Sequence, residues 1–197
     1  MLPLRGKILN VANATSTKLG QNQMLSDLIQ SLGAGTGPKY REEDLRYERV
    51  IIMTDADVDG AHIASLLITF FYRQMPRLID EGHLYLAVPP LYKLTHGSKS
   101  VYARDDAHKD ALMRSEFNAN AKVEVSRFKG LGEMNPQQLK ETTMDPARRT
   151  LLKVVLLADD REGTADSVER LMGTRAEARF AFISDKAEFA SEDLLDV

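Results

Sequence analysis

Cysteine and long apolar runs are both missing from this sequence. None of the 197 residues is a cysteine, which excludes disulfide bonds and thiolate metal sites and fits a reducing compartment. The longest strongly apolar stretch, residues 63–72, is too short to cross a bilayer, and Arg73 follows it. The N-terminus lacks the basic, apolar and small-residue succession of a secretory signal. We therefore expect a cytoplasmic protein with no membrane partner.

A strong excess of either charge is also missing. The net charge of −3 argues against a protein that wraps nucleic acid with its whole surface, although a local basic stripe remains compatible with it. With 43% hydrophobic and 28% charged residues, the composition is that of a soluble globular protein. The length is sufficient for one domain, or somewhat more, with a hydrophobic core.

The most informative stretch is RVIIMTDADVDG, residues 49–60. Its apolar run, residues 50–53, is typical of a strand buried on both faces of a parallel sheet. Asp55, Asp57 and Asp59 follow at a spacing of two, which in extended chain places side chains on one face roughly 6–7 Å apart. Three carboxylates this close repel one another unless a cation lies among them. Such oxygen ligands suit Mg²⁺, with Mn²⁺ as a possible substitute.

A calcium loop is the best rival interpretation of these aspartates. Asp55, Asp57, Asp59 and Gly60 match the first, third, fifth and sixth positions of an EF-hand loop. The twelfth position is Leu66, where the loop needs a bidentate glutamate, and the segment before the loop is predicted to be a strand instead of a helix. An acidic turn that binds nothing remains the other alternative.

The segment after the aspartates completes a strand–helix–strand unit. Apolar residues recur at helical spacing over residues 63–75, Pro76 ends or kinks this helix, and a second strand is expected at residues 83–88. Such a unit is right-handed, and its ligands collect at the carboxyl ends of the strands. His62 lies beside the acids and is a metal ligand, a phosphate contact or a capped surface histidine.

Two further segments carry cations beside glycines. Arg5-Gly6-Lys7 precedes a strand expected at residues 8–11, and either contacts phosphate or is a solvated turn. FKGLGEMNPQQLKETTMDP, residues 128–146, places Lys129 and Glu133 around two glycines before a helix that begins with Asn135 as its N-cap. This loop either presents backbone N–H groups to an anion or is an ordinary turn.

The remaining elements are expected from their local patterns. These are a helix ending at Gly33, a hairpin of residues 91–95 and 100–105, a polar helix 106–115, strands 123–128 and 151–157, a helix capped by Thr164 and closed by Gly173, and a helix 175–190. In the last helix Phe180, Ile183 and Phe189 are expected to face a core, while Arg179 is either a surface or a phosphate-facing residue.

Together TDADVDG, PLRGKILN and FKGLGEMNPQQLKETTMDP resemble the B subunits of bacterial type IIA DNA topoisomerases. The resemblance covers nearly the whole chain, and DGAHIASLLITFFYRQMP and GHLYLAVPPLYKLT look more like the topoisomerase IV branch than the gyrase branch. It implies an α/β fold with a toprim-type, Rossmann-like parallel sheet and flanking helices at residues 1–90, lacking its first strand and helix. A smaller α+β tail subdomain at residues 91–197, which docks on the A subunit, would follow.

The resemblance also implies roles for single residues. Asp55 and Asp57 would be catalytic and the principal Mg²⁺ ligands, with Asp59 a further ligand or support. Six residues would lie near double-stranded DNA, namely Arg5, Lys7, Asn10, His62, Lys129 and Arg179. The partner would be the A subunit in an A2B2 heterotetramer, whose tyrosine forms a transient double-strand break.

Two features of the family are not found in these residues. The toprim domains of this family begin with a glutamate in an EGDSA stretch upstream of PLRGK, and neither that stretch nor the ATP-binding region occurs here. We therefore expect the isolated chain to bind metal weakly and to be inactive, with ATP acting only through the missing region. A primase or nuclease of toprim type and a non-catalytic A-subunit docking fragment are the alternative functions.

Overall fold

The structure is a computed structural model that describes residues 1–12, 14–157 and 159–187. The chain forms two compact units that interleave along the sequence. The first unit consists of Met1–Val50, His62–Leu84 and Lys153–Val197, and the second of Ile51–Ala61 and Tyr85–Leu152. A domain boundary at residue 90 stays a prediction.

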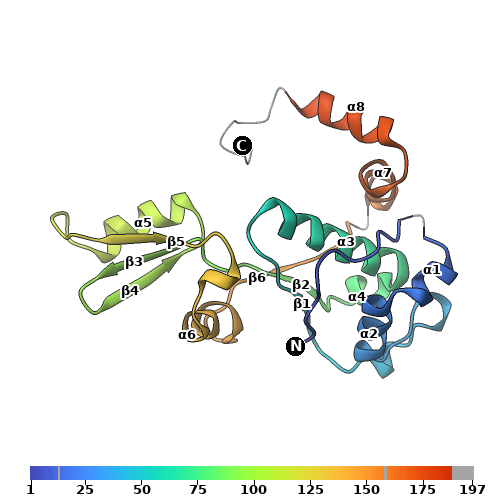
Figure 1. The fold of residues 1–197 in the computed structure, drawn as a ribbon, viewed down its shortest axis with the longest axis horizontal. Helices are drawn as coiled ribbons and strands as arrows, with labels where there is room; N and C mark the ends of the chain where they lie inside the picture. The colour runs from blue at the N-terminus through green and yellow to red at the C-terminus, as the bar shows by residue number, and fades with distance from the viewer. Residues whose placement is uncertain (13, 158, 188–197) are drawn as a thin grey trace. The chain divides into compact units, whose positions relative to one another are not determined.

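Helices make up most of the first unit (Figure 1). They are α1 (Ser16–Gln21), α2 (Gln23–Leu32), most of α3 (Val58–Gln74), α4 (Pro76–Asp80), α7 (Arg161–Met172) and α8 (Ala176–Ala187), with short 3₁₀ turns at Gly37–Lys39 and Glu42–Asp44. The core of this unit includes Leu25, Phe70, Phe71, Met75 and Leu78, each fully buried. Burial of such large side chains is the main stabilising contribution.

The predicted C-terminal ends of α2 and α3 are confirmed. Gly33 terminates α2 with φ +81°, a left-handed conformation that favours glycine. A Cβ atom there would also lie 2.9 Å from the Asp44 carbonyl oxygen. Pro76 separates α3 from α4 and occupies the first turn of α4, where its missing N–H group needs no partner.

A three-stranded sheet has the order β1 (Val50–Ile52), β2 (Leu84–Ala87), β6 (Leu151–Lys153). The expected strand at residues 151–157 is therefore shorter than predicted. The strand expected at residues 8–11 is wrong, because this segment has no regular structure. Ile8 and Val11 are nevertheless buried, so the apolar pattern there predicted burial and not backbone conformation.

The second unit contains an antiparallel sheet of order β4-β3-β5. Its strands are β3 (Tyr92–His96), β4 (Lys99–Ala103) and β5 (Glu124–Arg127), and α5 (Asp106–Glu116) contacts the first two. The predicted hairpin around Gly97 is confirmed, with Leu94 opposite Val101. α6 (Pro136–Leu139) has Asn135 as its N-cap, as predicted, and continues as a π-helix, Lys140–Met144.

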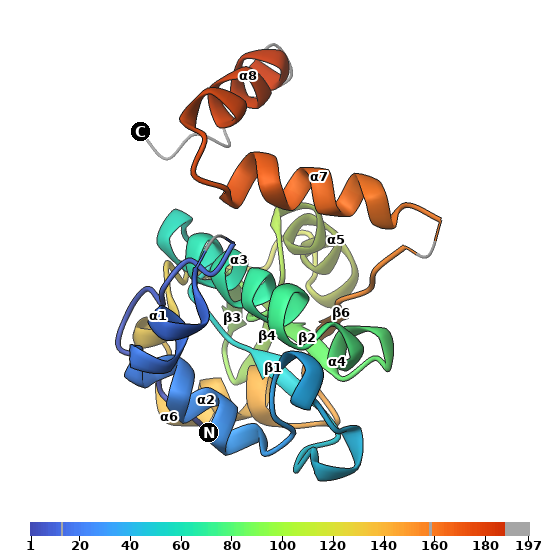
Figure 2. The same cartoon turned by 90° about the vertical axis from the view of Figure 1, so that its right-hand side faces the viewer.

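The two C-terminal helices follow one another after a short turn (Figure 2). The prediction that Thr164 caps α7 is wrong: α7 begins after Asp160, and the Thr164 hydroxyl donates back to the Asp160 carbonyl at 2.9 Å. The prediction that Phe180 and Ile183 face a core is also wrong, since they are 73% and 63% exposed. Phe189 lies outside the described residues. Helical periodicity shows which side chains share a face, but not whether anything covers that face.

Candidate metal centre and nucleic-acid contacts

Asp55 and Asp57 lie in the turn between β1 and α3, and both are exposed. Asp57 immediately precedes α3, and its Oδ1 accepts a hydrogen bond of 2.6 Å from the Gly60 N–H group. This is the N-cap arrangement, in which an aspartate oxygen satisfies a backbone donor of the first helical turn. The helix start therefore restrains the Asp57 carboxylate.

Gly60 allows the first turn of α3 to approach Asp55 closely. It has no positive φ, but a Cβ atom built on it would lie 2.0 Å from the Asp55 carbonyl oxygen. Since real Cβ atoms do not approach backbone so closely, any side chain at residue 60 would displace the turn that carries the aspartates. Close packing against the Asp55 backbone therefore requires glycine at residue 60, whether or not a metal ion binds.

Asp55 is also held from the glycine loop, residues 129–133. Its Oδ1 accepts a hydrogen bond of 2.7 Å from the Leu131 N–H group. The loop is closed by the Glu133 carboxylate, which accepts from the Lys129 N–H group at 2.7 Å. The loop therefore does present a backbone N–H group to an anion, and that anion is a side chain of the same chain. The sequence did not predict this contact.

The carboxylates of Asp55 and Asp57 fit a magnesium site, although they do not form a complete set of ligands. No group of three histidine, cysteine, aspartate or glutamate side chains is arranged as a metal site within residues 1–12, 14–157 and 159–187. Asp59 is exposed in the first turn of α3. Two exposed carboxylates are nevertheless sufficient for Mg²⁺, which commonly binds one or two carboxylates together with water and phosphate oxygens.

The calcium-loop interpretation is wrong for this chain. α3 begins at Val58, inside the stretch that an EF-hand would need as loop. The residue at the twelfth position, Leu66, is a buried helical residue with 3% exposure. A calcium loop requires an oxygen ligand at that position.

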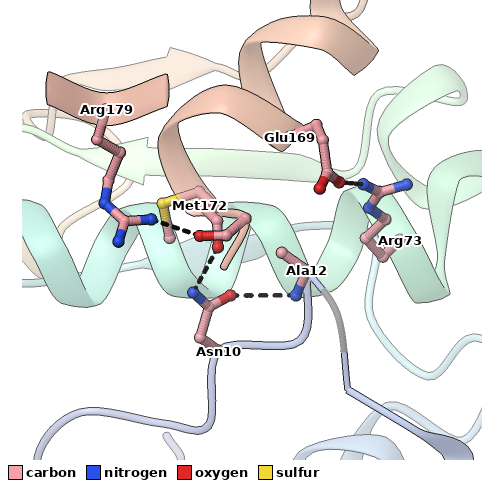
Figure 3. Close-up of polar contacts among 7 residues, drawn as sticks. Asn10, Ala12, Arg73, Glu169, Met172 and Arg179 are labelled. Atoms are coloured by element: carbon pink, nitrogen blue, oxygen red, sulfur yellow. Dashed lines mark hydrogen bonds and ion pairs between the residues drawn. The ribbon is translucent and has the colours of Figure 1, made fainter. Parts of the chain in front are cut away.

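Two of the predicted DNA contacts, Asn10 and Arg179, converge on the C-terminal end of α7 (Figure 3). Asn10 donates from Nδ2 to the Met172 carbonyl at 2.8 Å, and its Oδ1 accepts from the Ala12 N–H group at 3.1 Å. Arg179 donates to the Gly173 carbonyl. Carbonyls at a helix end lack intrahelical partners and carry partial negative charge, so both side chains stabilise this end of α7.

Arg73 and Glu169 join α3 to α7 in the same region, at 3.2 Å (Figure 3). Neither residue stood out in the sequence, because they are 96 positions apart and belong to different helices. The four other predicted DNA contacts, Arg5, Lys7, His62 and Lys129, have exposed side chains. Gly6, between Arg5 and Lys7, has φ +117°.

Comparison with known families defines the class of protein. The Toprim domain family matches residues 1–89, and the family described as DNA gyrase B subunit, carboxyl terminus, matches residues 120–184. These two matches occur in the order predicted by the motifs. The chain belongs to the B subunits of type IIA DNA topoisomerases.

Particular relatives refine this assignment. The chain is 66% identical over 194 residues to the B subunit of DNA topoisomerase 4 from Caulobacter vibrioides, covering 98% of this chain and 28% of the relative. It is 61% identical over 191 residues to the B subunit of DNA topoisomerase 4 from Bartonella bacilliformis, covering 97% and 28%. The B subunit of DNA gyrase from Halalkalibacterium halodurans is 49% identical over 189 residues, covering 96% and 29%.

The chain therefore spans less than a third of the length of these relatives. Within its described residues, every helix is too short or too polar to span a membrane.

Proposed function

We propose that this chain is the metal-binding part of a topoisomerase IV B subunit and acts with an A subunit in transient double-strand DNA cleavage and religation. The topoisomerase IV branch is supported by its relatives of 66% and 61% identity, against 49% for the gyrase relative. A cytoplasmic location and an A2B2 assembly belong to the same proposal.

The observation that carries this proposal is the pair of restrained, exposed carboxylates after β1. The Leu131 N–H group holds Asp55, and the Gly60 N–H group holds Asp57. Preorganised ligands bind a metal ion at a lower ordering cost than mobile ones. Asp55 and Asp57 would hold Mg²⁺, or Mn²⁺, with Asp59 as a further ligand.

In this mechanism the nucleophile is a tyrosine of the A subunit, and the present chain provides the electrostatic environment of the reacting phosphate. A bound Mg²⁺ supplies stabilisation of charge on phosphoryl oxygens and on the 3′ oxygen. Arg5, Lys7, His62 and Lys129 would contact backbone phosphates and fix the position of the duplex. ATP would act through a region outside these residues.

The test is DNA cleavage by a full-length B subunit that carries Asp55→Asn or Asp57→Asn, assayed with the A subunit across a range of Mg²⁺ concentrations. We expect either change to lower cleavage by about 100-fold or more, because each removes a negative ligand without changing side-chain size. Asp110→Asn, at an exposed position on α5, is the matched control and should leave cleavage unchanged. Near-normal cleavage by both variants would contradict the metal role.

A second candidate function, docking on the A subunit, is favoured by the exposed aromatic and aliphatic side chains of α8. Phe180 and Ile183 lie on one face of this helix at 73% and 63% exposure. Phe182 instead packs under Arg170 of α7, with 5.7 Å between the guanidinium carbon and the ring centre. Large apolar side chains exposed together are typical of protein interfaces.

A further inference from the structure

Gly130 and Gly132 occupy the same loop but have different surroundings. A Cβ atom on Gly130 would lie 3.0 Å from both Cγ and Oδ1 of Asp55, and 3.4 Å from Oδ2. A Cβ atom on Gly132 would have nothing within 4 Å. Neither glycine has a positive φ, so the backbone at both positions accepts alanine. The constraint on Gly130 is therefore the Asp55 carboxylate itself.

The loop is anchored on both sides and closed internally. Phe128 and Met134, which flank it, are 8% and 7% exposed. Inside the loop Glu133 donates its N–H group to the Gly130 carbonyl at 3.2 Å, while its carboxylate accepts from Lys129. Buried side chains fix both ends of the loop, and hydrogen bonds within it hold its backbone together. The Leu131 N–H group can therefore take few positions. The Asp55 carboxylate is thus hydrogen-bonded to a restrained donor.

We propose that this glycine loop is a positioning element for the metal ligand Asp55. Gly130 leaves room for the carboxylate and Leu131 fixes its Oδ1, so that the carboxylate would be available to a divalent ion in one orientation. The inference rests on the proposed metal function and extends it to Gly130 and Leu131, which are not among the proposed metal ligands or DNA contacts. If the loop were only a structural turn, a change at Gly130 would alter stability and leave the metal requirement as it is.

The test compares Gly130→Ala with Gly132→Ala in a full-length B subunit. We expect Gly130→Ala to raise the Mg²⁺ concentration for half-maximal DNA cleavage by about 10-fold or more, the usual effect of losing the partner that orients a metal ligand. Mn²⁺ affinity of the isolated full-length protein, followed by electron paramagnetic resonance, should weaken in parallel. Gly132→Ala should change neither. Equal metal requirements in the two variants would overturn the proposal.

A second pair of variants tests the loop without changing Gly130. Glu133→Ala removes the acceptor for the Lys129 N–H group, whereas Glu133→Gln keeps one, and both remove the same charge. We expect the metal requirement to rise more for the alanine variant than for the glutamine variant. Equal effects of the two Glu133 variants would contradict a role for loop closure. This comparison can be made even if Gly130→Ala does not fold.

Failure of the positioning role can be told apart from failure of the metal role. Hydrogen exchange at the Leu131 amide should be slow in the unaltered full-length protein and faster in Asp55→Ala, whether or not Asp55 binds metal. If that difference is seen but Asp55→Asn cleaves DNA normally, the proposed function fails and the loop contact stands. If Leu131 exchanges equally in both proteins, the contact itself is refuted.

Discussion

At the scale of single residues, Asp106 shows how a surface carboxylate is held without burial. It accepts hydrogen bonds from Lys109 Nζ and from the Tyr92 hydroxyl, the latter at 3.0 Å. These contacts, first that from Lys109, lower the pKa of Asp106 from its ordinary value and raise the pKa of Lys109. The interaction joins the start of α5 to β3.

A lowered aspartate pKa means that the stabilisation is present above the ordinary aspartate pKa and is lost as the pH falls through the folded-state value. We expect Asp106→Asn to speed hydrogen exchange of α5 amides in the full-length protein near neutral pH. The difference from the unaltered protein should shrink as the pH falls below the ordinary aspartate pKa and the carboxylate becomes protonated. Comparison at equal pH removes the intrinsic pH dependence of exchange. A difference that grew with acidity would contradict this assignment.

At the scale of elements, α6 depends on its first turn because it is only four residues long. Asn135 and Gln138 form a reciprocal capping box, each side chain accepting from the other's backbone N–H group at 2.9 Å. The following π-helix continues to Met144. A short helix has few internal hydrogen bonds, so the capping contacts are a large share of its stability.

We expect Asn135→Ala to destabilise α6 by about 1 kcal/mol, the usual cost of losing an N-cap. Amides of residues 136–144 should then exchange about five-fold faster in the full-length protein. Asn135→Asp keeps an acceptor oxygen and should behave as the unaltered protein does. Equal exchange in Asn135→Ala and Asn135→Asp would show that the cap does not limit local opening.

Local sequence patterns predicted the ends of several helices correctly, but not the strand at residues 8–11 or the burial of α8. Asn135, Pro136 and Gly33 each act through backbone groups within four residues, and the helix ends predicted from them are confirmed. The strand predicted at residues 8–11 was wrong because strand formation needs hydrogen-bond partners from elsewhere in the chain, which the pattern does not specify. Likewise, the apolar spacing of Phe180 and Ile183 predicted a shared face, and only the structure shows that face exposed.

At the scale of the whole molecule, the exposed face of α8 is the feature that a partner would explain. Phe180→Asp and Ile183→Asp should each weaken, by about 10-fold or more, the affinity between the full-length protein and the A subunit, since large buried side chains dominate interface energies. Val125→Asp, at a 47% exposed position on β5, is the control. Unchanged affinity of both α8 variants, measured by calorimetry, would exclude this face as the docking surface.

The sequence by itself determined the acidic turn after an apolar strand, the helix caps and the family, since each depends on residues close together in the chain or on whole motifs. Only the tertiary structure showed that Leu131 holds Asp55, 76 residues away, and that Asn10 reaches the end of α7, 162 residues away. The physical reason is that such contacts depend on how distant segments pack. Periodicity and capping patterns describe one segment at a time and contain no information about that packing.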